Sequence, residues 1–267
     1  MSYSSTSVSG EQSNSKSQQI IVIMPCYNEE GRVGKVVSAV KEIIPDATIL
    51  VIDDASTDNS AQEAEKAGAM TLRHACNLGY GAAIETGYLF AFRHGYDIVL
   101  QMDSDGQHLA SELPTILQPV LEDKADIVLG SRHMGKKSPE NEKMPVVRRL
   151  GQYFFSALIF LITGLKLTDP TSGFQALNRR AIRLFSSGVF PCDYPDSDII
   201  IMAHMAGLRI REVPVVMKAR CGGKSMHSGL KPVYYGMKML LAIFIVLLNV
   251  GSWHKWRKAL QDKTPCS

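Results

Sequence analysis

Short apolar runs alternate with longer stretches of helical periodicity along the first half of the chain. The apolar runs stop at polar or turn residues, as buried strands do. In the stretches between them, apolar residues recur at helical spacing, and glycine or proline follows most of these stretches. We therefore predict strands over residues 20–24, 48–53, 70–72, 98–102 and 126–130, with helices over 32–44, 58–67, 80–94 and 111–122.

This alternation predicts an α/β fold. Strands alternating with helices build a mostly parallel sheet through right-handed crossovers, with helices covering both faces. Ligands of such sheets bind beyond the carboxyl ends of the strands. Three polar segments follow predicted strands, so we expect them to converge on one edge: PCYNEE (25–30), DD (53–54) and DSD (103–105).

The second half of the chain follows a different pattern. Residues 152–167 are mostly apolar, DPTSGFQ (169–175) is a cluster of turn residues, and 196–206 has helical character. A strand is predicted over 211–217, before a glycine-rich basic loop (218–231) and a long hydrophobic helix (233–250). Residues 1–18 are rich in Ser and Gln without an apolar run, so we predict a disordered tail and no secretory signal.

Composition narrows the classes of function. A chain of 267 residues with 45% hydrophobic content fits one large domain, or one domain with an appendage. The formal net charge of +3 is too mild for a nucleic-acid binder. The five cysteines are scattered and never form a C-x-x-C pair, which favours reduced thiols and argues against a zinc site.

Asp103 and Asp105 end an otherwise apolar run. In an extended chain the side chains of residues i and i+2 point the same way, so both carboxylates can reach one cation. Hard oxygen ligands at a strand end suit Mg²⁺ or Mn²⁺, which bridges to substrate phosphates, and Gln107 adds a neutral oxygen. A helix cap or a solvated loop is the alternative, but the neighbouring polar strand ends favour the metal site.

The segment VIDDASTD (51–58) carries two roles. Ser56 or Thr57, followed by Asp58, can cap the next helix. Capping does not explain Asp53 and Asp54 at the end of the strand. Carboxylates at that place can accept hydrogen bonds from a nucleobase or from a ribose hydroxyl.

The glycines of NLGYGAA (77–83) resemble a phosphate cradle at a helix N-terminus. A dinucleotide-binding fingerprint would lie in the first turn of the fold, where this chain has PCYNEE instead. Tight turning is therefore the favoured role of Gly79 and Gly81.

Seven segments, in this order and spacing, resemble the family 2 glycosyltransferases with a GT-A fold, and most closely the dolichyl- or polyprenyl-phosphate sugar synthases. They are PCYNEE, VIDDASTD, NLGYGAA, MDSDGQH, GSR, DPTSGFQ and REVPV. The resemblance implies a Rossmann-like GT-A domain over 19–231 and inverting, metal-dependent transfer of a hexose. The donor would be a UDP- or GDP-sugar, and the acceptor a polyprenyl or dolichyl phosphate.

Two alternatives stand beside this interpretation. A glycosyltransferase with a soluble or glycan acceptor is disfavoured by the hydrophobic C-terminus. A non-catalytic nucleotide-sugar-binding membrane protein is disfavoured by Asp103 and Asp105, because an idle site need not keep clustered carboxylates.

The resemblance also assigns roles to residues at matching positions. It implies binding of the nucleotide-sugar by Pro25, Tyr27, Glu29, Asp53, Asp54, Asp103, Arg220 and Lys224, and of Mg²⁺ or Mn²⁺ by Asp103, Asp105 and Gln107. It implies binding of the acceptor phosphate by Arg132, Arg148, Arg149 and Ser225. Asp169 is the favoured base or orienter, with Asp196 and Asp198 as rivals, so the catalytic set is Asp103, Asp105, Asp169, Asp196 and Asp198.

The C-terminal segment (232–267) holds a helix that is apolar on all sides between Met239 and Leu248. Residues 233–250 would span roughly 27 Å at about 1.5 Å per residue, against a hydrocarbon core of about 30 Å. We expect this segment to attach the protein to the cytoplasmic side of a membrane, peripherally or as a single helix. Trp253 and Trp256, with the basic residues around them, would form an interfacial anchor. The alternative is a helix packed in the core or in a homo-oligomer.

Overall fold

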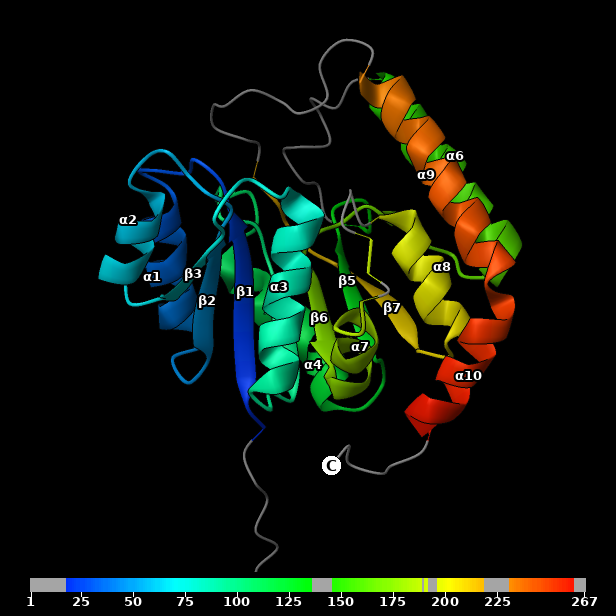
Figure 1. Cartoon of the computed structure of the whole chain (residues 1–267), viewed down its shortest axis with the longest axis horizontal. Coiled ribbons are helices and arrows are strands. Elements are labelled where there is room, and N and C mark those ends of the chain that lie inside the picture. The colour runs from blue at the N-terminus through cyan, green and yellow to red at the C-terminus, as the bar shows by residue number, and fades with distance from the viewer. Residues whose placement is uncertain (1–17, 136–145, 189, 192–195, 219–230, 262–267) are drawn as a thin grey trace, which may run out of the picture.

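The computed structural model describes residues 18–135, 146–188, 190–191, 196–218 and 231–261 (Figure 1). The predicted tail lies outside these residues, apart from residue 18. The basic loop lies outside them over 219–230, which includes Arg220, Lys224 and Ser225.

A seven-stranded sheet forms the centre of the molecule, in the order β3-β2-β1-β4-β6-β5-β7. Six strands run parallel, and β6 runs antiparallel to both of its neighbours. The predicted α/β class with a mostly parallel sheet is therefore confirmed. The strands are β1 Ile20–Cys26, β2 Thr48–Asp53, β3 Met70–Arg73, β4 Ile98–Gln101, β5 Ile127–Ser131, β6 Gln175–Asn178 and β7 Ile210–Pro214.

Alternation along β1 divides the core into two halves, because successive side chains of a strand point to opposite faces. Ile21 and Ile23 join one buried cluster, whereas Val22 and Met24 join the other. The first cluster lies under α3 (Tyr80–Arg93), α7 (Arg179–Phe185) and α8 (Ser197–Met205); the second lies under α1 (Val33–Ile43), α2 (Ser60–Lys66) and α4 (Leu113–Leu121). Helices thus cover both faces of the sheet (Figure 1).

Three further helices extend the first of these layers. They are α6 (Val146–Thr163), α9 (Lys231–Leu248) and α10 (Val250–Gln261), and each packs on α8. A short 3₁₀ turn, Ala110–Glu112, precedes α4. Most elements predicted in the first half begin and end within two residues of the observed bounds.

The strand β1 continues through Pro25, where the sequence had predicted its end. Pro25 lacks the N–H that a strand residue donates to a neighbouring strand. The partner β4 pairs with β1 only as far as Ile23, so Pro25 has a single neighbouring strand, β2. The proline therefore breaks no ladder.

The hydrophobic helix predicted over 233–250 corresponds to α9, and a second helix, α10, follows it. Trp253 of α10 is buried, and its indole nitrogen donates to the carbonyl of Val246 at 2.8 Å. Arg180 and Arg183 donate to the carbonyls of Leu260 (3.3 Å) and Ala259 (3.1 Å) at the far end of α10. The prediction that Trp253 belongs to an interfacial anchor is therefore wrong, because Trp253 packs in the protein core.

Among the described residues, no single helix has both the length and the hydropathy to cross a bilayer. The segments Gly236–Leu248 and Gly251–Leu260 reach that threshold only when they are joined, and they bend by 72° at their junction.

Candidate active site

The loop after β1 is bound to the loop after β2. Four successive backbone amides, from Asn28 to Gly31, donate to side chains of the second loop and of the helix that follows it. Their acceptors are Ser56 (3.0 Å), Ser60 (2.7 Å), Asp58 (3.1 Å) and Glu63 (2.7 Å). The helix α2 begins only at Ser60, and Asn59 before it makes no side-chain cap. The prediction that Ser56 or Thr57 caps this helix is therefore wrong, since Ser56 binds the neighbouring loop instead. Asp58, which the prediction included, does accept from the amide of Ser60, the first residue of α2, at 3.0 Å.

Asp53 lies at the end of β2 and is fully buried. Its Oδ1 accepts from the amide of Ser56 at 3.1 Å, and the Nε of Arg73 lies 3.2 Å from its Oδ2. Across the first loop, the side chain of Tyr27 is 49% exposed. A buried carboxylate and an exposed aromatic ring thus lie on the adjoining ends of β1 and β2, where a nucleobase is predicted to bind.

Asp54 binds the start of α3. Its Oδ1 accepts from the amide of Leu78 and its Oδ2 from the amide of Gly79, both at 2.8 Å, and the Nδ1 of His74 lies 2.8 Å from Oδ1. Gly79 has φ 95°, a left-handed conformation that favours glycine. Two of the amides that a phosphate cradle would offer are therefore used by Asp54. Gly79 supports the tight turn, whereas Gly81 lies inside α3 and does not.

The segment Asp103–Asp105 is a turn rather than the end of an extended strand. The strand β4 ends at Gln101, and residues 104–105 form the turn. Alternation along a strand is therefore the wrong reason for placing both carboxylates together. The Oγ of Ser104 donates to the carbonyl of Pro25 at 2.7 Å, and the amide of Gln107 donates to Oδ1 of Asp105 at 2.9 Å. The first bond holds the turn against β1, and the second lies within the turn itself.

Two aromatic neighbours hold Asp103. The hydroxyl of Tyr80 donates to Oδ1 at 3.0 Å, and the backbone amide of Asp103 donates to Nδ1 of His108 at 2.9 Å. Because Nδ1 accepts, the proton of neutral His108 is assigned to Nε2, which lies 3.7 Å from Oδ2. Burial and the charge of Asp103 raise the pKa of Tyr80 well above its usual value, so the phenol remains a donor.

The oxygens of Asp103, Asp105 and Gln107 are of the kind that Mg²⁺ and Mn²⁺ prefer. The side chain of Asp103 is 29% exposed, which leaves it within reach of a ligand. In the part of the chain that the structure describes, no three His, Cys, Asp or Glu side chains are grouped to hold a metal ion. Asp103, Asp105 and Gln107 are candidate ligands for a cation that would take its remaining ligands from a substrate, and their role stays a prediction.

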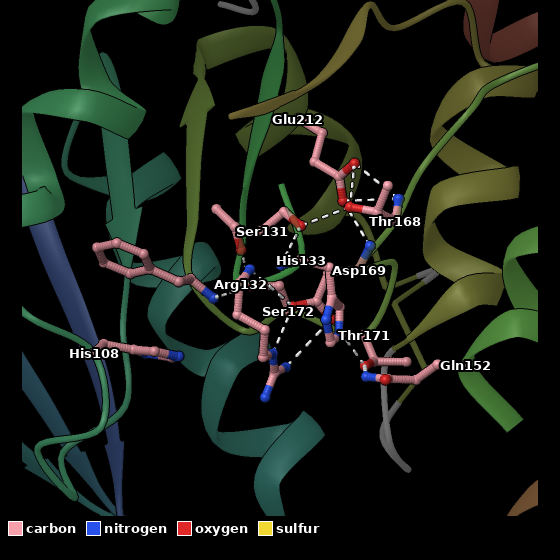
Figure 2. Close-up of polar contacts among 12 residues, drawn as sticks. His108, Ser131, Arg132, His133, Gln152, Thr168, Asp169, Thr171, Ser172 and Glu212 are labelled. Atoms are coloured by element: carbon pink, nitrogen blue, oxygen red, sulfur yellow. Dashed lines mark hydrogen bonds and ion pairs between the residues drawn. The ribbon is translucent and has the colours of Figure 1, made fainter. Parts of the chain in front are cut away.

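Arg132 and Asp169 form a buried ion pair (Figure 2). The Nε of Arg132 donates to Oδ2 of Asp169 at 2.6 Å, and Nη2 donates to Oδ1 at 3.3 Å. Arg132 follows β5, whereas Asp169 opens the DPTSGFQ segment. A general base must reach the acceptor oxygen. The complete burial of Asp169 and its hydrogen bonds from Arg132 support the role of orienter over that of base.

Glu212, in β7, holds the backbone beside Asp169 (Figure 2). Its carboxylate accepts from the amide of Asp169 at 2.6 Å, from the amide of Thr168 at 2.8 Å and from the Oγ1 of Thr168 at 3.0 Å. The Oγ1 of Thr168 lies 2.7 Å from the Oγ of Ser131, the residue before Arg132. The network therefore joins β5, β7 and the DPTSGFQ segment around the ion pair.

The rival aspartates lie at the start of α8. Asp198 is buried, its Oδ1 accepts from the amide of Asp196 at 3.1 Å, and burial raises its pKa above the ordinary value. Asp196 precedes the first residue of the helix, and its charge helps to raise the pKa of Tyr80. The catalytic role of Asp196 stays a prediction.

The structure describes only some of the side chains predicted to bind phosphate. Arg132 lies in the site, and Arg149 is exposed in the first turn of α6. Arg148 is in the same turn, but its side chain lies outside the described part, as do Arg220, Lys224 and Ser225. The basic loop nevertheless begins beside the turn Asp103–Asp105, called the D-x-D turn below, because the amide of Lys218 donates to the carbonyl of Gln107 at 2.9 Å.

Sequence reasoning missed Tyr80 and Glu212. Both lie inside quoted segments, NLGYGAA and REVPV, where only the glycines and the overall match were considered. Glu212 lies next to Val213 in a predicted strand, and a carboxylate there must find donors. That signal was available in the sequence, whereas the partner of Tyr80 was not.

The sequence is similar to a known protein family and to characterised enzymes. The sequence profile described as "Glycosyl transferase family 2" matches residues 21–185, more than half of the chain. The UDP-N-acetylglucosamine–dolichyl-phosphate N-acetylglucosaminyltransferase of Methanococcus voltae is 30% identical over 243 residues, covering 83% of this chain and 95% of that protein. The undecaprenyl-phosphate mannosyltransferase of Micrococcus luteus is 29% identical over 218 residues, covering 79% and 88%.

Solved structures show the same fold. Glucosyl-3-phosphoglycerate synthase from Mycobacterium tuberculosis, in complex with Mn²⁺, UDP-glucose and phosphoglyceric acid, superposes with a TM-score of 0.64. The two sequences are 19% identical, and the match covers 86% of this chain and 80% of that one. At this identity the likeness concerns the fold alone.

Proposed function

The chain belongs to glycosyl transferase family 2, and from this premise we propose that it moves a hexose from a UDP- or GDP-sugar to a polyprenyl or dolichyl phosphate, with inversion. Membership makes the protein a family 2 glycosyltransferase with a GT-A fold. The acceptor class is supported by two similar enzymes, whose names specify dolichyl phosphate and undecaprenyl phosphate.

One observation carries the proposal: the D-x-D turn meets the DPTSGFQ segment. A Cβ built on Gly173 would lie 3.6 Å from Oδ1 of Asp103, so this loop passes directly beside the carboxylate. The same loop begins with Asp169, which binds Arg132. Candidate ligands for a cation and for a phosphate thus lie on one edge of the sheet, where parallel α/β folds bind substrates.

The donor would bind at the ends of β1, β2 and β4. Asp53 and Tyr27 would receive the base, and the neighbouring Pro25, Glu29 and Asp54 would line the same end of the sheet. A Mg²⁺ or Mn²⁺ ion held by Asp103, Asp105 and Gln107 would neutralise the diphosphate and so make it a better leaving group. Arg220 and Lys224 are proposed to add positive charge from the basic loop.

The acceptor phosphate would bind at Arg132, with Arg148, Arg149 and Ser225. A phosphate is already ionised at neutral pH, so positioning contributes more to its attack on the anomeric carbon than a strong base does. The buried pair with Asp169 fits this requirement because it holds Arg132 in one orientation. We therefore propose that Asp169 orients Arg132.

The membrane surface is the proposed place of reaction. Of the sixteen large hydrophobic side chains exposed among the described residues, eleven lie on α6 and α9. These eleven side chains are Leu150, Tyr153, Phe154, Phe160, Leu161, Met237, Leu240, Leu241, Phe244, Ile245 and Leu248. An exposed apolar surface of this kind suits a lipid interface. We propose that this surface lies on the cytoplasmic face of a membrane.

A transfer assay tests the proposal. UDP-glucose, UDP-N-acetylglucosamine and GDP-mannose would each be supplied with Mg²⁺ or Mn²⁺ and with either a long polyprenyl phosphate or a soluble phosphate acceptor. We expect transfer to the polyprenyl phosphate from one of these donors, dependent on the cation. Transfer to the soluble acceptor alone would contradict the proposal and favour a glycosyltransferase with a soluble or glycan acceptor. Nucleotide-sugar binding without any transfer would favour a non-catalytic protein.

A further inference from the structure

Tyr80 is the first residue of α3, and its phenol reaches across to the D-x-D turn. The hydroxyl donates to Oδ1 of Asp103 at 3.0 Å. Among the contacts of the described residues, Oδ2 of Asp103 has only the approach of His108 Nε2 at 3.7 Å, which is too long for a hydrogen bond. Among the described residues, Oδ1 of Asp103 therefore accepts a side-chain hydrogen bond that Oδ2 lacks.

A chain of buried polar groups sets the direction of this hydrogen bond. The hydroxyl of Tyr88 donates to Oε1 of Gln101, which turns the amide nitrogen of Gln101 toward Tyr80. That nitrogen lies 3.5 Å from the phenol oxygen of Tyr80 and donates to it. Because this oxygen accepts from Gln101, its own proton is directed to Asp103. Gln101 and Tyr88 are both buried, so the chain is shielded from water and each bond orients the next.

Gly173 of the DPTSGFQ segment provides independent evidence that the hydroxyl is built into the site. A Cβ at this position would lie 2.6 Å from the phenol oxygen of Tyr80, closer than real Cβ contacts come. The backbone of Gly173 is not in the left-handed region, so its conformation does not require glycine. The loop lacks a side chain here because the Tyr80 hydroxyl occupies the space.

We propose that Tyr80 is a positioning residue for the divalent cation. By engaging Oδ1 of Asp103, its hydroxyl turns Oδ2 toward the ion that binds with the donor diphosphate. The inference rests on the proposed metal-dependent transfer and adds a residue that supports the metal ligand. Partners that orient a metal ligand typically change metal affinity by about 10–100-fold when they are removed.

The test compares Tyr80→Phe with Tyr96→Phe. Each change removes one phenol oxygen, but the Tyr96 hydroxyl binds Thr48 Oγ1 at 3.0 Å and lies just before β4, far from the D-x-D turn at its other end. Binding of Mn²⁺ in the presence of UDP or GDP would be followed by calorimetry and by the electron paramagnetic resonance signal of free Mn²⁺. We expect binding about 10–100-fold weaker in Tyr80→Phe and unchanged in Tyr96→Phe. Nucleotide binding without metal should be equal in all three proteins.

A kinetic measurement separates positioning from a general loss of structure. In Tyr80→Phe the Mn²⁺ concentration for half-maximal transfer should rise, while kcat at saturating Mn²⁺ should return close to that of the wild type. Gly173→Ala, which crowds the hydroxyl without removing it, should weaken Mn²⁺ binding in the same direction. This second variant tests the proposal even if Tyr80→Phe does not fold.

Three outcomes are distinguishable. Normal Mn²⁺ binding in a folded Tyr80→Phe, with metal-dependent binding in the wild type, would overturn the role of Tyr80 alone. Normal Mn²⁺ binding in Gly173→Ala would likewise contradict it. A wild type that binds UDP and GDP equally with and without Mn²⁺ would overturn the proposed metal site and this inference together.

Discussion

Arg132 binds both carboxylate oxygens of Asp169 within the protein, at 2.6 Å from Nε and 3.3 Å from Nη2. A buried charge without a partner costs several kcal/mol, so each of these residues requires the other. The pair lies where β5 ends and the DPTSGFQ segment begins. Its position links the proposed phosphate ligand to the aspartate that the sequence had presented as a candidate base.

This pair predicts non-additive kinetics. We expect Asp169→Asn to lower kcat by roughly 100-fold, as when a single oriented donor is lost, with little change in donor affinity. Arg132→Ala should have a similar effect on kcat. The double variant should be no worse than the more damaged single variant, because both changes disable one unit. Steady-state kinetics and nucleotide titration measure these quantities.

If Asp169→Asn keeps near-normal turnover while Asp196→Asn loses it, the catalytic role moves from Asp169 to Asp196.

Glu212 is predicted to act on the same pair through the backbone. In Glu212→Gln the new amide N–H₂ would face the donors of Thr168 and Asp169, and each unsatisfied donor costs about 1–3 kcal/mol. We expect a lower melting temperature and a roughly tenfold lower kcat. Glu122→Gln is the matched control, since Glu122 pairs with Lys124 on the surface. Equal behaviour of the two variants would show that the network contributes nothing to transfer.

Asp105 is predicted to be essential for the metal and dispensable for folding. Its carboxylate accepts from the amide of Gln107, two residues away, and the residue lies in a turn outside the buried core. Asp105→Ala should therefore abolish transfer and Mn²⁺-dependent binding of UDP or GDP while the melting temperature stays close to that of the wild type. Calorimetry with and without Mn²⁺ provides the measurement. Unchanged Mn²⁺-dependent binding would remove Asp105 from the metal site.

Asp126 predicts a dependence of stability on pH. Burial alone would raise its pKa, but hydrogen bonds from Arg209 and Asn178 and the charge of Arg180 lower the pKa below its ordinary value. A depressed pKa in the folded state stabilises the protein above the unfolded pKa of about 4, and the contribution is lost as pH falls below it. We expect the wild type to lose free energy of unfolding below about pH 4.

The variant Asp126→Asn isolates this contribution. At pH 7 it should unfold with a free energy about 2–4 kcal/mol lower, because a buried, multiply bonded carboxylate is removed. Its stability should also fall less steeply between pH 4 and pH 3. Urea unfolding across a pH series checks both statements. Parallel curves for the two proteins would show that another acid controls the loss.

The exposed face of α9 predicts membrane binding. Replacing Leu241, Phe244 and Leu248 by serine removes apolar surface that is 57–68% exposed, so folding should be preserved. We expect less sedimentation with lipid vesicles, and poorer transfer to long polyprenyl phosphates than to short water-soluble ones. The matched control changes three exposed apolar residues elsewhere, Ile43, Met70 and Leu121, to serine.

These substitutions test the surface more sharply than a truncation after Lys231 would. Deletion of α9 and α10 would remove Ile243, Val246 and Trp253 from the buried core and so expose α8. Unchanged vesicle binding in the α9 variant, or a wild type that does not bind vesicles, would contradict the membrane proposal.

Periodicity predicted the elements whose signal is local. The strands β1, β2 and β4 are short apolar runs between turn residues, and α1 and α3 repeat apolar residues at helical spacing. The strand β6 and the helix α7 were missed. A four-residue strand such as β6 has almost no pattern of its own, and it exists because β4 and β5 pair with it from both sides. The helix α7 did carry a local signal, since Asn178 caps it through the amides of Arg180 and Ala181.

The C-terminal segment shows the limit of hydropathy. The same apolar residues serve in a bilayer or in a protein core, so composition could not assign Trp253. The structure assigns it to the core because α8 offers an apolar face to both α9 and α10.

By itself, the sequence determined the α/β class, the family and the polar segments that follow the strands, because each depends on residue types at short spacing. Only the tertiary structure decided how those residues are used. Asp54 binds the start of α3, Asp169 binds Arg132, and Tyr80 binds Asp103. These partners are 23 to 37 residues apart. A hydrogen bond depends on distance and direction in space, and only the packing of strands and helices brings such partners together.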